Sequence, residues 1–188
     1  AQAAAPRRWL TFLGELLAAA DIPTLQASLG YCLIPSTKGQ RMMLIIGKGG
    51  EGKSRIGLVL KKLMGDAVSN GSIQKIETSR FARADLEHRL LMVDDDTDMN
   101  ALPKTNYLKS IVTAEAKMDV ERKGIQSYQS DIYARFLGFG NGALTSLYDH
   151  SDGFWRRQLI LTTKERPTGR EDDPFLVEKL CEELEGIL

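Results

Sequence analysis

Residues 42–64 read MMLIIGKGGEGKSRIGLVLKKLM, in which an apolar run, a glycine-rich loop and an amphipathic stretch follow one another. The unbroken apolar run 42–46 predicts a short strand that is buried on both faces of a sheet. The stretch 55–64 predicts a helix that ends at Gly65. Between them, residues 47–54 match the complete pattern G-x-x-x-x-G-K-[ST], and the flanking strand and helix are the context that this phosphate-binding loop requires.

The loop 47–54 is predicted to bind a nucleoside triphosphate. Its glycines allow consecutive backbone N–H groups to point toward one anion, and the N-terminus of the following helix adds positive charge. Lys53 would reach the β- and γ-phosphates, and the Ser54 hydroxyl would ligate Mg²⁺. The residues predicted to hold the nucleotide are Gly47, Lys48, Gly49, Gly50, Glu51, Gly52, Lys53 and Ser54.

The loop is open to two other interpretations. Gly47, Gly49 and Gly52 also match G-x-G-x-x-G, which is typical of dinucleotide sites. Such a site requires an acidic residue about 20 positions further on, at the end of a strand, and Glu77 is a loose candidate for it. A dinucleotide site has no use for the Lys-Ser pair that follows the last glycine, so the triphosphate prediction is favoured. A solvated glycine-rich turn with an incidental lysine is the purely structural alternative.

Length and composition indicate a single domain, or a domain with a small appendage. The 188 residues include 25 basic and 25 acidic side chains, and this zero net charge argues against a protein that coats nucleic acid with its whole surface. Any nucleic-acid contact would come from a local basic cluster. No apolar span is long enough to cross a membrane, and the N-terminus lacks the pattern of a signal peptide. Because the chain begins at Ala1 rather than at Met, we expect a fragment of a longer protein.

The cysteines and histidines give no sign of a metal site. Cys32 and Cys181 are far apart and lack metal-like spacing, so two buried free thiols in a reducing cytosol are expected rather than a disulfide. His88 and His150 have no His or Cys partner at i, i+4, which argues against zinc.

The remaining chain alternates between helical and strand patterns, which predicts an α/β sandwich around a largely parallel sheet. Helix is expected over 7–33, with a break at Asp21 as the N-cap of its second part, and Phe81 and Leu86 are expected to face inward. The other expected elements are strands at 72–76, 90–93, 136–139 and 158–161, helices at 79–88, 104–117 and 175–188, and a hairpin over 118–129 around Lys123-Gly124. This organisation divides into an N-terminal helical segment, 1–38, and a P-loop domain, 39–188.

Three aspartates follow the apolar run 90–93. In P-loop NTPases, an acidic residue at the tip of a buried strand completes the metal site, and a second one orients or deprotonates the attacking water. Asp94 and Asp95 are the favoured pair, although the sequence alone does not fix which two of Asp94, Asp95 and Asp96 act. A helix cap or a solvated acidic turn is the structural alternative.

The same run also has the spacing that begins a calcium-binding loop, D-x-D-x-D at Asp94, Asp96 and Asp98. That interpretation fails because the sixth position is Met99 rather than Gly, and the twelfth is Thr105 rather than Glu.

Polar residues border two later strands. Asn141 ends the stretch 136–141, where its amide would hydrogen-bond the attacking water, or would simply occupy a turn before Gly142. Arg156 and Arg157 precede the strand 158–161. They would form surface ion pairs, or one would project into a neighbouring subunit as an arginine finger.

Taken in order, five stretches resemble the superfamily 3 helicase domain of phage and plasmid replicative primase-helicases, a branch of the AAA+ ATPases. These stretches are GKGGEGKS at 47–54, LLMVDD at 90–95, DVERKG at 119–124, FLGFGN at 136–141 and DGFWRR at 152–157. The lead-in LQASLGYCLIP at 25–35 is similar as well, so the resemblance covers about residues 7–165.

The resemblance implies an AAA+-like, three-layer P-loop fold and an ATP-dependent DNA helicase motor that uses Mg²⁺. Asp94 and Asp95 would be the Walker B pair, with Asp94 joining Ser54 at the metal, and Asn141 would be the sensor. Arg157 would be the finger, with Arg156 as its alternate. Lys123 would lie on a hairpin that grips single-stranded DNA inside a homo-hexameric ring. The resemblance also implies a possible primase domain upstream in the full-length protein. It further implies no contact with a membrane and a location in the cytoplasm of a host cell.

The sequence also departs from the family pattern. Asn141 is followed by Gly-Ala-Leu instead of a Glu-Leu-Pro-like sequence, and the last strand continues into Thr-Thr-Lys-Glu at 162–165. Two rival functions are therefore kept: an ATP-dependent DNA loader or initiator that does not unwind, and a small P-loop kinase, which would carry an arginine-rich lid.

Overall fold

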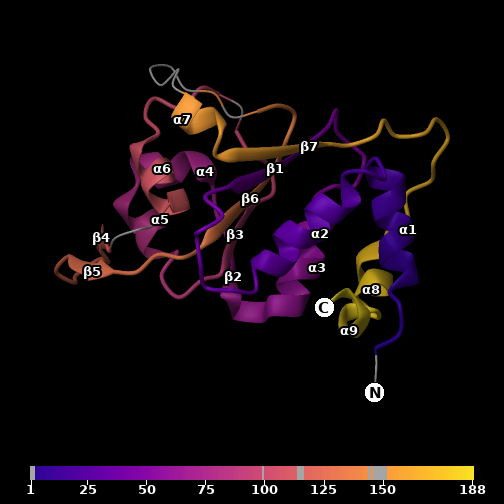
Figure 1. Ribbon diagram of the computed structural model, residues 1–188, viewed down its shortest axis with the longest axis horizontal. Helices are drawn as coiled ribbons and strands as arrows, with labels where there is room; N and C mark the ends of the chain where they lie inside the picture. The colour runs from indigo at the N-terminus through magenta and orange to yellow at the C-terminus, as the bar shows by residue number, and fades with distance from the viewer. Residues whose placement is uncertain (1–2, 99, 114–116, 144, 146–151) are drawn as a thin grey trace.

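The computed structural model describes residues 3–98, 100–113, 117–143, 145 and 152–188. Its centre is a five-stranded sheet with helices on both faces (Figure 1). In spatial order the strands are β2 (Val68–Asn70), β3 (Leu91–Asp94), β6 (Arg135–Gly140), β1 (Met42–Ile46) and β7 (Gln158–Thr162). All neighbouring strands pair in parallel. The predicted parallel α/β architecture is therefore confirmed.

The strand register brings several predicted residues to one edge of the sheet. Ile46, the last residue of β1, pairs with Gly140 of β6 and with Thr162 of β7. Asp94, the last residue of β3, pairs with Gly138 of β6. Since all these strands run in the same direction, the segments that follow them start from the same carboxyl edge, where ligands of open α/β sheets bind.

Helices cover the sheet in two layers. One layer holds α1 (Arg7–Leu16), α2 (Ile22–Tyr31), α3 (Arg55–Met64), α8 (Leu176–Cys181) and α9 (Leu184–Ile187). The other holds α4 (Ile73–Thr78), α5 (Arg80–Ala84), α6 (Asn106–Thr113) and α7 (Asp152–Trp155). A short 3-10 turn, η1 (Gly65–Ala67), links α3 to β2. The arrangement is a three-layer sandwich.

Alternation along the strands supplies a separate core to each helical layer. In β3, Leu91 and Val93 belong to the core beneath α3, whereas Met92 belongs to the core beneath α4 and α6. In β6, Phe139 likewise faces the first core and Phe136 the second. Because successive strand residues point to opposite faces, an unbroken apolar run is what such a two-faced sheet requires.

The N-terminal helices belong to the first of these cores. Trp9, Phe12 and Leu13 of α1 are buried together with Ile45 of β1. After α1, Leu17 forms an isolated bridge with Thr163 beyond β7. The helices α1 and α2 thus share one core with the sheet.

The prediction of a strand at 72–76 was wrong. The second strand is β2, and residues 73–78 form α4 instead. Ile73 and Ile76 are three residues apart and both buried, which is the spacing of one helical face. The first-turn N–H of Ile73 donates to Asp94 Oδ2 at 2.7 Å, so a side chain from another strand stabilises the start of this helix.

Smaller expectations also need correction. Phe81 is 44% exposed rather than inward-facing, whereas Leu86 is buried as expected. Asp21 precedes α2, but its side chain makes no capping hydrogen bond. The helix expected at 175–188 is interrupted and forms α8 and α9. The helix expected at 104–117 is α6; residues 114–116 lie outside the described residues, as does His150.

The predicted hairpin is confirmed. β4 (Met118–Val120) and β5 (Tyr128–Ser130) pair antiparallel, apart from the main sheet, and Gly124 in the connection has a φ of 77°. Both thiols are free; Cys32 is buried and Cys181 is half-buried. Within the described ranges, no helix has both the length and the apolarity needed to cross a membrane.

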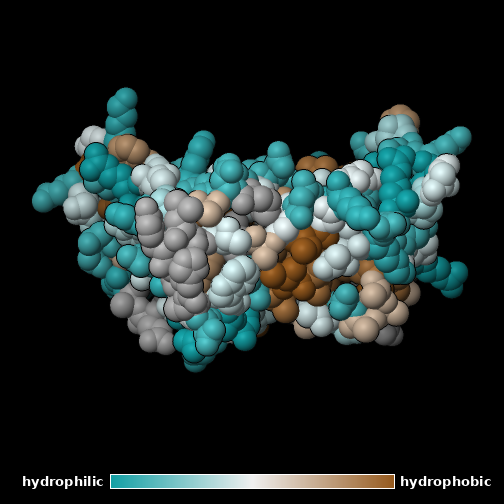
Figure 2. Space-filling model, turned by 90° about the horizontal axis from the view of Figure 1, so that it is seen from above, coloured by the Kyte–Doolittle hydropathy of each residue, from teal (hydrophilic) through white to brown (hydrophobic). Residues whose placement is uncertain are grey.

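The surface differs between the middle and the ends of the molecule. Seen from above, an apolar patch lies near the middle of this face, and the two ends are mainly hydrophilic (Figure 2). The hairpin lies at one end and residues 163–173 lie at the other (Figure 1).

Candidate functional site

The loop 47–54 leaves β1 at the carboxyl edge and enters α3 directly. Gly49, Gly50 and Gly52 have φ angles of 108°, 79° and 89°, a region that side-chain-bearing residues rarely adopt. The N–H of Gly47 donates to the carbonyl oxygen of Gly140 at 3.0 Å. This bond fixes the start of the loop to the end of β6.

A buried carboxylate lies among the donors of this loop. Glu51 is 3% exposed, and its side chain accepts hydrogen bonds from Gly49 N–H at 2.8 Å and from Lys53 Nζ at 3.2 Å. Burial opposes its ionisation, but the backbone and Lys53 hydrogen bonds together hold the pKa of Glu51 below its ordinary value. The loop therefore already surrounds one anion, which is the behaviour that a phosphate site needs.

The segment 163–173 packs over the same loop. Thr163 N–H donates to Ile46 at 2.8 Å, and Arg170 Nη2 donates to the carbonyl oxygen of Glu51 at 3.2 Å. Arg166 Nη1 lies 3.5 Å from the position that a Cβ on Gly50 would take. Sequence reasoning missed both arginines, because only the pairing of β1 with β7 brings this segment to the loop.

The aspartates after β3 point in different directions. Asp94 is 4% exposed and is bonded to Ile73 of α4; burial raises its pKa, an effect that this hydrogen bond partly offsets. Asp95 Oδ1 instead lies 3.4 Å from the position that a Cβ on Gly57 of α3 would take, and burial raises its pKa as well. Asp95 thus faces the helix that follows Ser54, whereas Asp94 is bonded to α4.

The third predicted strand end also reaches this edge. Asn141 is exposed and directly follows Gly140, the residue that binds Gly47. The turn after Asp96 is held to the same strand, since Thr97 N–H donates to Phe139 at 2.8 Å. The loop, the acidic turn and Asn141 are thereby joined around the end of β6.

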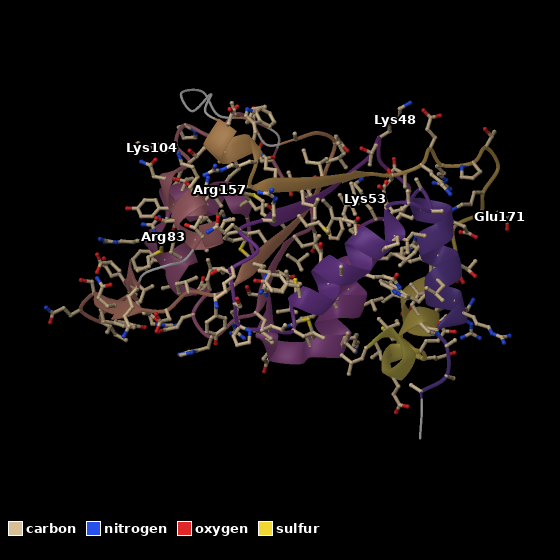
Figure 3. All side chains as sticks on the ribbon, viewed as in Figure 1. Lys48, Lys53, Arg83, Lys104, Arg157 and Glu171 are labelled. Atoms are coloured by element: carbon tan, nitrogen blue, oxygen red, sulfur yellow. The ribbon has the colours of Figure 1, made fainter. Side chains whose placement is uncertain are left out.

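The two arginines before β7 lie at the other edge of the sheet. Arg157 is half-buried, and its Nη1 donates to the carbonyl oxygen of Gly153 in α7. Arg156 is exposed. Figure 3 shows Arg157 at the start of β7, well apart from Lys53. Within one chain, this pair is therefore separated from the phosphate loop.

The hairpin is attached to the body through Glu87. Glu87 Oε2 accepts hydrogen bonds from Tyr128 Oη at 2.6 Å and Arg122 Nη2 at 3.1 Å, and Oε1 accepts one from Ser130 Oγ at 2.6 Å. The hydrogen bonds from Ser130 and Tyr128 contribute most to lowering the pKa of Glu87, to about 2. Lys123, beyond this attachment, is exposed.

Replacing Glu87 by Gln is expected to loosen the hairpin and to lower the free energy of unfolding by about 1–3 kcal/mol at neutral pH, because charge-assisted hydrogen bonds are lost. Because the pKa of Glu87 is lower in the folded state, its ionised carboxylate stabilises the fold fully above the ordinary pKa of 4.5. This stabilisation is lost as the pH falls toward about 2. Urea unfolding of both forms at several pH values would measure this, with the exposed Glu185→Gln as the control. Equal midpoints at pH 7 would contradict the attachment.

Comparison with solved structures defines the class of fold. The NrS-1 C-terminal region aligns with a TM-score of 0.75 at 17% identity, over 98% of this chain and 45% of that chain. JCV Helicase, bound to a thiazolopyridine-phenoxyphenyl acetamide, aligns with a TM-score of 0.56 at 17% identity, over 97% of this chain and 51% of that one. This chain thus spans about half the length of these proteins and has a helicase-like fold.

The sequence places the chain in a particular family. Residues 45–157 match the family described as "Family of unknown function (DUF5906)", and the protein belongs to this family. The matched region runs from the end of β1 to Arg157 and contains the loop 47–54, the acidic turn, the hairpin and Asn141.

Proposed function

We propose that this domain is the ATP-driven motor of a superfamily 3 DNA helicase from a phage- or plasmid-type replication protein. In this proposal it hydrolyses ATP within a homo-hexameric ring and moves along single-stranded DNA. The observation that carries the proposal is the buried Glu51 carboxylate, because two donors of the loop, Gly49 N–H and Lys53 Nζ, both point toward it, which supports a site for an anion. The helicase-like fold supports it further.

ATP would bind through the donors that now hold Glu51. The triphosphate and the Glu51 carboxylate compete for Gly49 N–H and Lys53, so nucleotide binding displaces Glu51 from them. Arg166 and Arg170 pack over the loop, where both pair with Asp172, at 3.2 Å and 3.6 Å. To interact with the phosphates, they would exchange part of this pairing for the nucleotide. The glycines leave room for the backbone to approach the phosphate oxygens.

The oxygen donors needed for Mg²⁺ are present on the same side of the sheet. Ser54, which carries the hydroxyl, is the N-cap of α3, and the Asp95 carboxylate faces that helix. A hydroxyl, a carboxylate, water and substrate phosphates form the donor set that Mg²⁺ prefers, and the bound ion neutralises phosphate charge. If Asp95 ligates the metal, the acting pair is Asp95 and Asp96 instead of the favoured Asp94 and Asp95, and Asp96 would act on the attacking water. Asn141 would orient that water.

Replacing Asp95 by Asn is expected to slow ATP hydrolysis about 10- to 100-fold while leaving nucleotide affinity nearly unchanged, because the residue orients the metal and its water. Asp94→Asn is the matched comparison: it should mainly lower the melting temperature, since Asp94 is buried against α4. Turnover and fluorescent-nucleotide binding measure the two effects. If Asp94→Asn alone removes turnover, the expected orientation is incorrect.

Lys123 is proposed to contact DNA phosphates from the exposed end of the hairpin. Lys123→Ala is expected to retain basal ATP hydrolysis and to lose strand separation. A loader or initiator shares the nucleotide site but does not unwind, so normal DNA-stimulated ATPase without strand displacement by the wild type would favour that alternative. Transfer of the γ-phosphate to a small molecule, instead of release as phosphate, would favour a kinase.

A further inference from the structure

A pocket of about 600 Å³ opens between α5, α6 and the strands of the hairpin. Its lining includes Arg80, Arg83, Tyr107, Lys117 and Glu121. Figure 3 shows Arg83 on the hairpin side of the molecule, away from Lys53 and Lys48. None of these residues belongs to the nucleotide site described above.

An aromatic ring and a buried cation form the centre of this pocket. The Arg83 guanidinium lies 3.7 Å from the centroid of the Tyr107 ring. Arg83 is 8% exposed; its Nη1 donates to Ile76 at 2.8 Å, and its Nε has no hydrogen-bond partner among the described residues. The cation covers one face of the ring and holds it in place.

Tyr107 is only partly covered by its surroundings. Tyr107 is 41% exposed and lines the pocket, although α6 buries its neighbours Leu108 and Ile111. A large aromatic ring that is held against a cation and is partly exposed in a pocket can stack a nucleobase. Stacking of this kind accepts any base, as a motor that moves along DNA requires.

The charges around the pocket favour a base over a phosphate. Arg80 pairs with Glu121 at 3.0 Å, and Asp119 also lines the pocket. Carboxylates next to the basic groups reduce the attraction for phosphate, whereas an uncharged aromatic base is not repelled by them. The pocket therefore complements Lys123 instead of duplicating it.

The pocket is continuous with the hairpin. Met118 and Val120 of β4 are part of its lining, and the same strand leads to Lys123. From this geometry we propose that Tyr107, supported by Arg83, stacks a base of the single-stranded nucleic acid whose phosphates contact Lys123. The inference rests on the proposed function, and it assigns base stacking to one residue of the DNA-binding surface.

Fluorescence anisotropy with a labelled oligo-dT tests the stacking. Tyr107→Ala is expected to weaken binding about 5- to 100-fold, and Tyr107→Phe, which keeps the ring, should bind like the wild type. Phe175→Ala, which removes another exposed aromatic residue, is the matched control and should have no effect. Circular dichroism would establish that each variant is folded.

An oligonucleotide with abasic sites separates stacking from phosphate contact. The wild type and Tyr107→Ala should bind the abasic oligonucleotide equally. On oligo-dT, the salt dependence of binding should be the same for both proteins, because the substitution removes no phosphate contact. Equal loss on both probes overturns the stacking. Oligo-U tests RNA as the alternative single strand. If Tyr107→Ala weakens oligo-U binding as much as oligo-dT binding, Tyr107 also stacks the bases of RNA.

The outcomes distinguish this inference from the proposed function. If Lys123→Ala weakens DNA binding while Tyr107→Ala does not, the stacking is refuted and the motor proposal stands. If the wild-type chain binds no single-stranded nucleic acid at all, both are refuted.

Discussion

Replacing Lys53 by Ala is expected to reduce ATP hydrolysis by at least about two orders of magnitude, because a charge-assisted contact to the β- and γ-phosphates is lost where charge develops in the transition state. The same change leaves the buried Glu51 carboxylate without its ammonium partner; the two side chains are only 4% and 12% exposed. The folded state should therefore lose stability as well. Turnover and thermal unfolding, measured on the same preparation, record both effects.

Lys48 provides a matched control within the same loop. Its side chain is 81% exposed and pairs with Glu165 at the surface, so Lys48→Ala should change turnover and melting temperature very little. Combining Lys53→Ala with Glu51→Gln should restore part of the lost stability without restoring turnover, because the unpaired carboxylate is removed but the phosphate contact is not. Near-normal turnover of Lys53→Ala would refute the nucleotide site.

A second consequence concerns the competition between Glu51 and the triphosphate. With Glu51→Gln alone, the loop donors are less strongly occupied in the absence of nucleotide, so ATP is expected to bind more tightly. Isothermal titration calorimetry would measure the affinity. Weaker binding would mean that Glu51 assists the nucleotide instead of competing with it.

The sequence predicted those elements whose signals are local. The apolar run 42–46, the glycines and the amphipathic run 55–64 lie within one short stretch, and β1 and α3 have the predicted bounds. Lys123-Gly124 predicted the hairpin for the same reason, since Gly124 adopts the positive φ that a tight connection requires.

The features that sequence reasoning missed depend on distant residues. The start of α4 is stabilised by Asp94, 21 positions further along the chain, and residues 72–76 alone do not reveal this contact. The directions of Asp94 and Asp95 depend on which core each face of β3 meets. Arg170 reaches Glu51 across 119 positions, through the pairing of β7 with β1.

Arg156→Ala is expected to reduce the rate of ATP hydrolysis about a thousandfold while ATP binds normally. Within its own chain, Arg156 lies before β7, at the edge opposite the phosphate loop, and it is exposed. A guanidinium so placed reaches a phosphate only in a neighbouring subunit. Arg157, expected from the resemblance to be the finger, is half-buried and bonded to Gly153, so we expect Arg157→Ala mainly to lower the melting temperature.

Mixing the variants tests whether the arginine acts between subunits. Arg156→Ala keeps an intact loop and Lys53→Ala keeps an intact arginine, so one of the mixed interfaces contains both groups and should recover part of the activity. Wild-type turnover per subunit should rise steeply with protein concentration, because each site is completed only when a neighbour docks. A surface arginine of purely structural function predicts no recovery and rates that are linear in concentration. If the mixture stays inactive while both variants assemble, Arg156 is not the finger; recovery with Arg157→Ala instead would assign that function to Arg157.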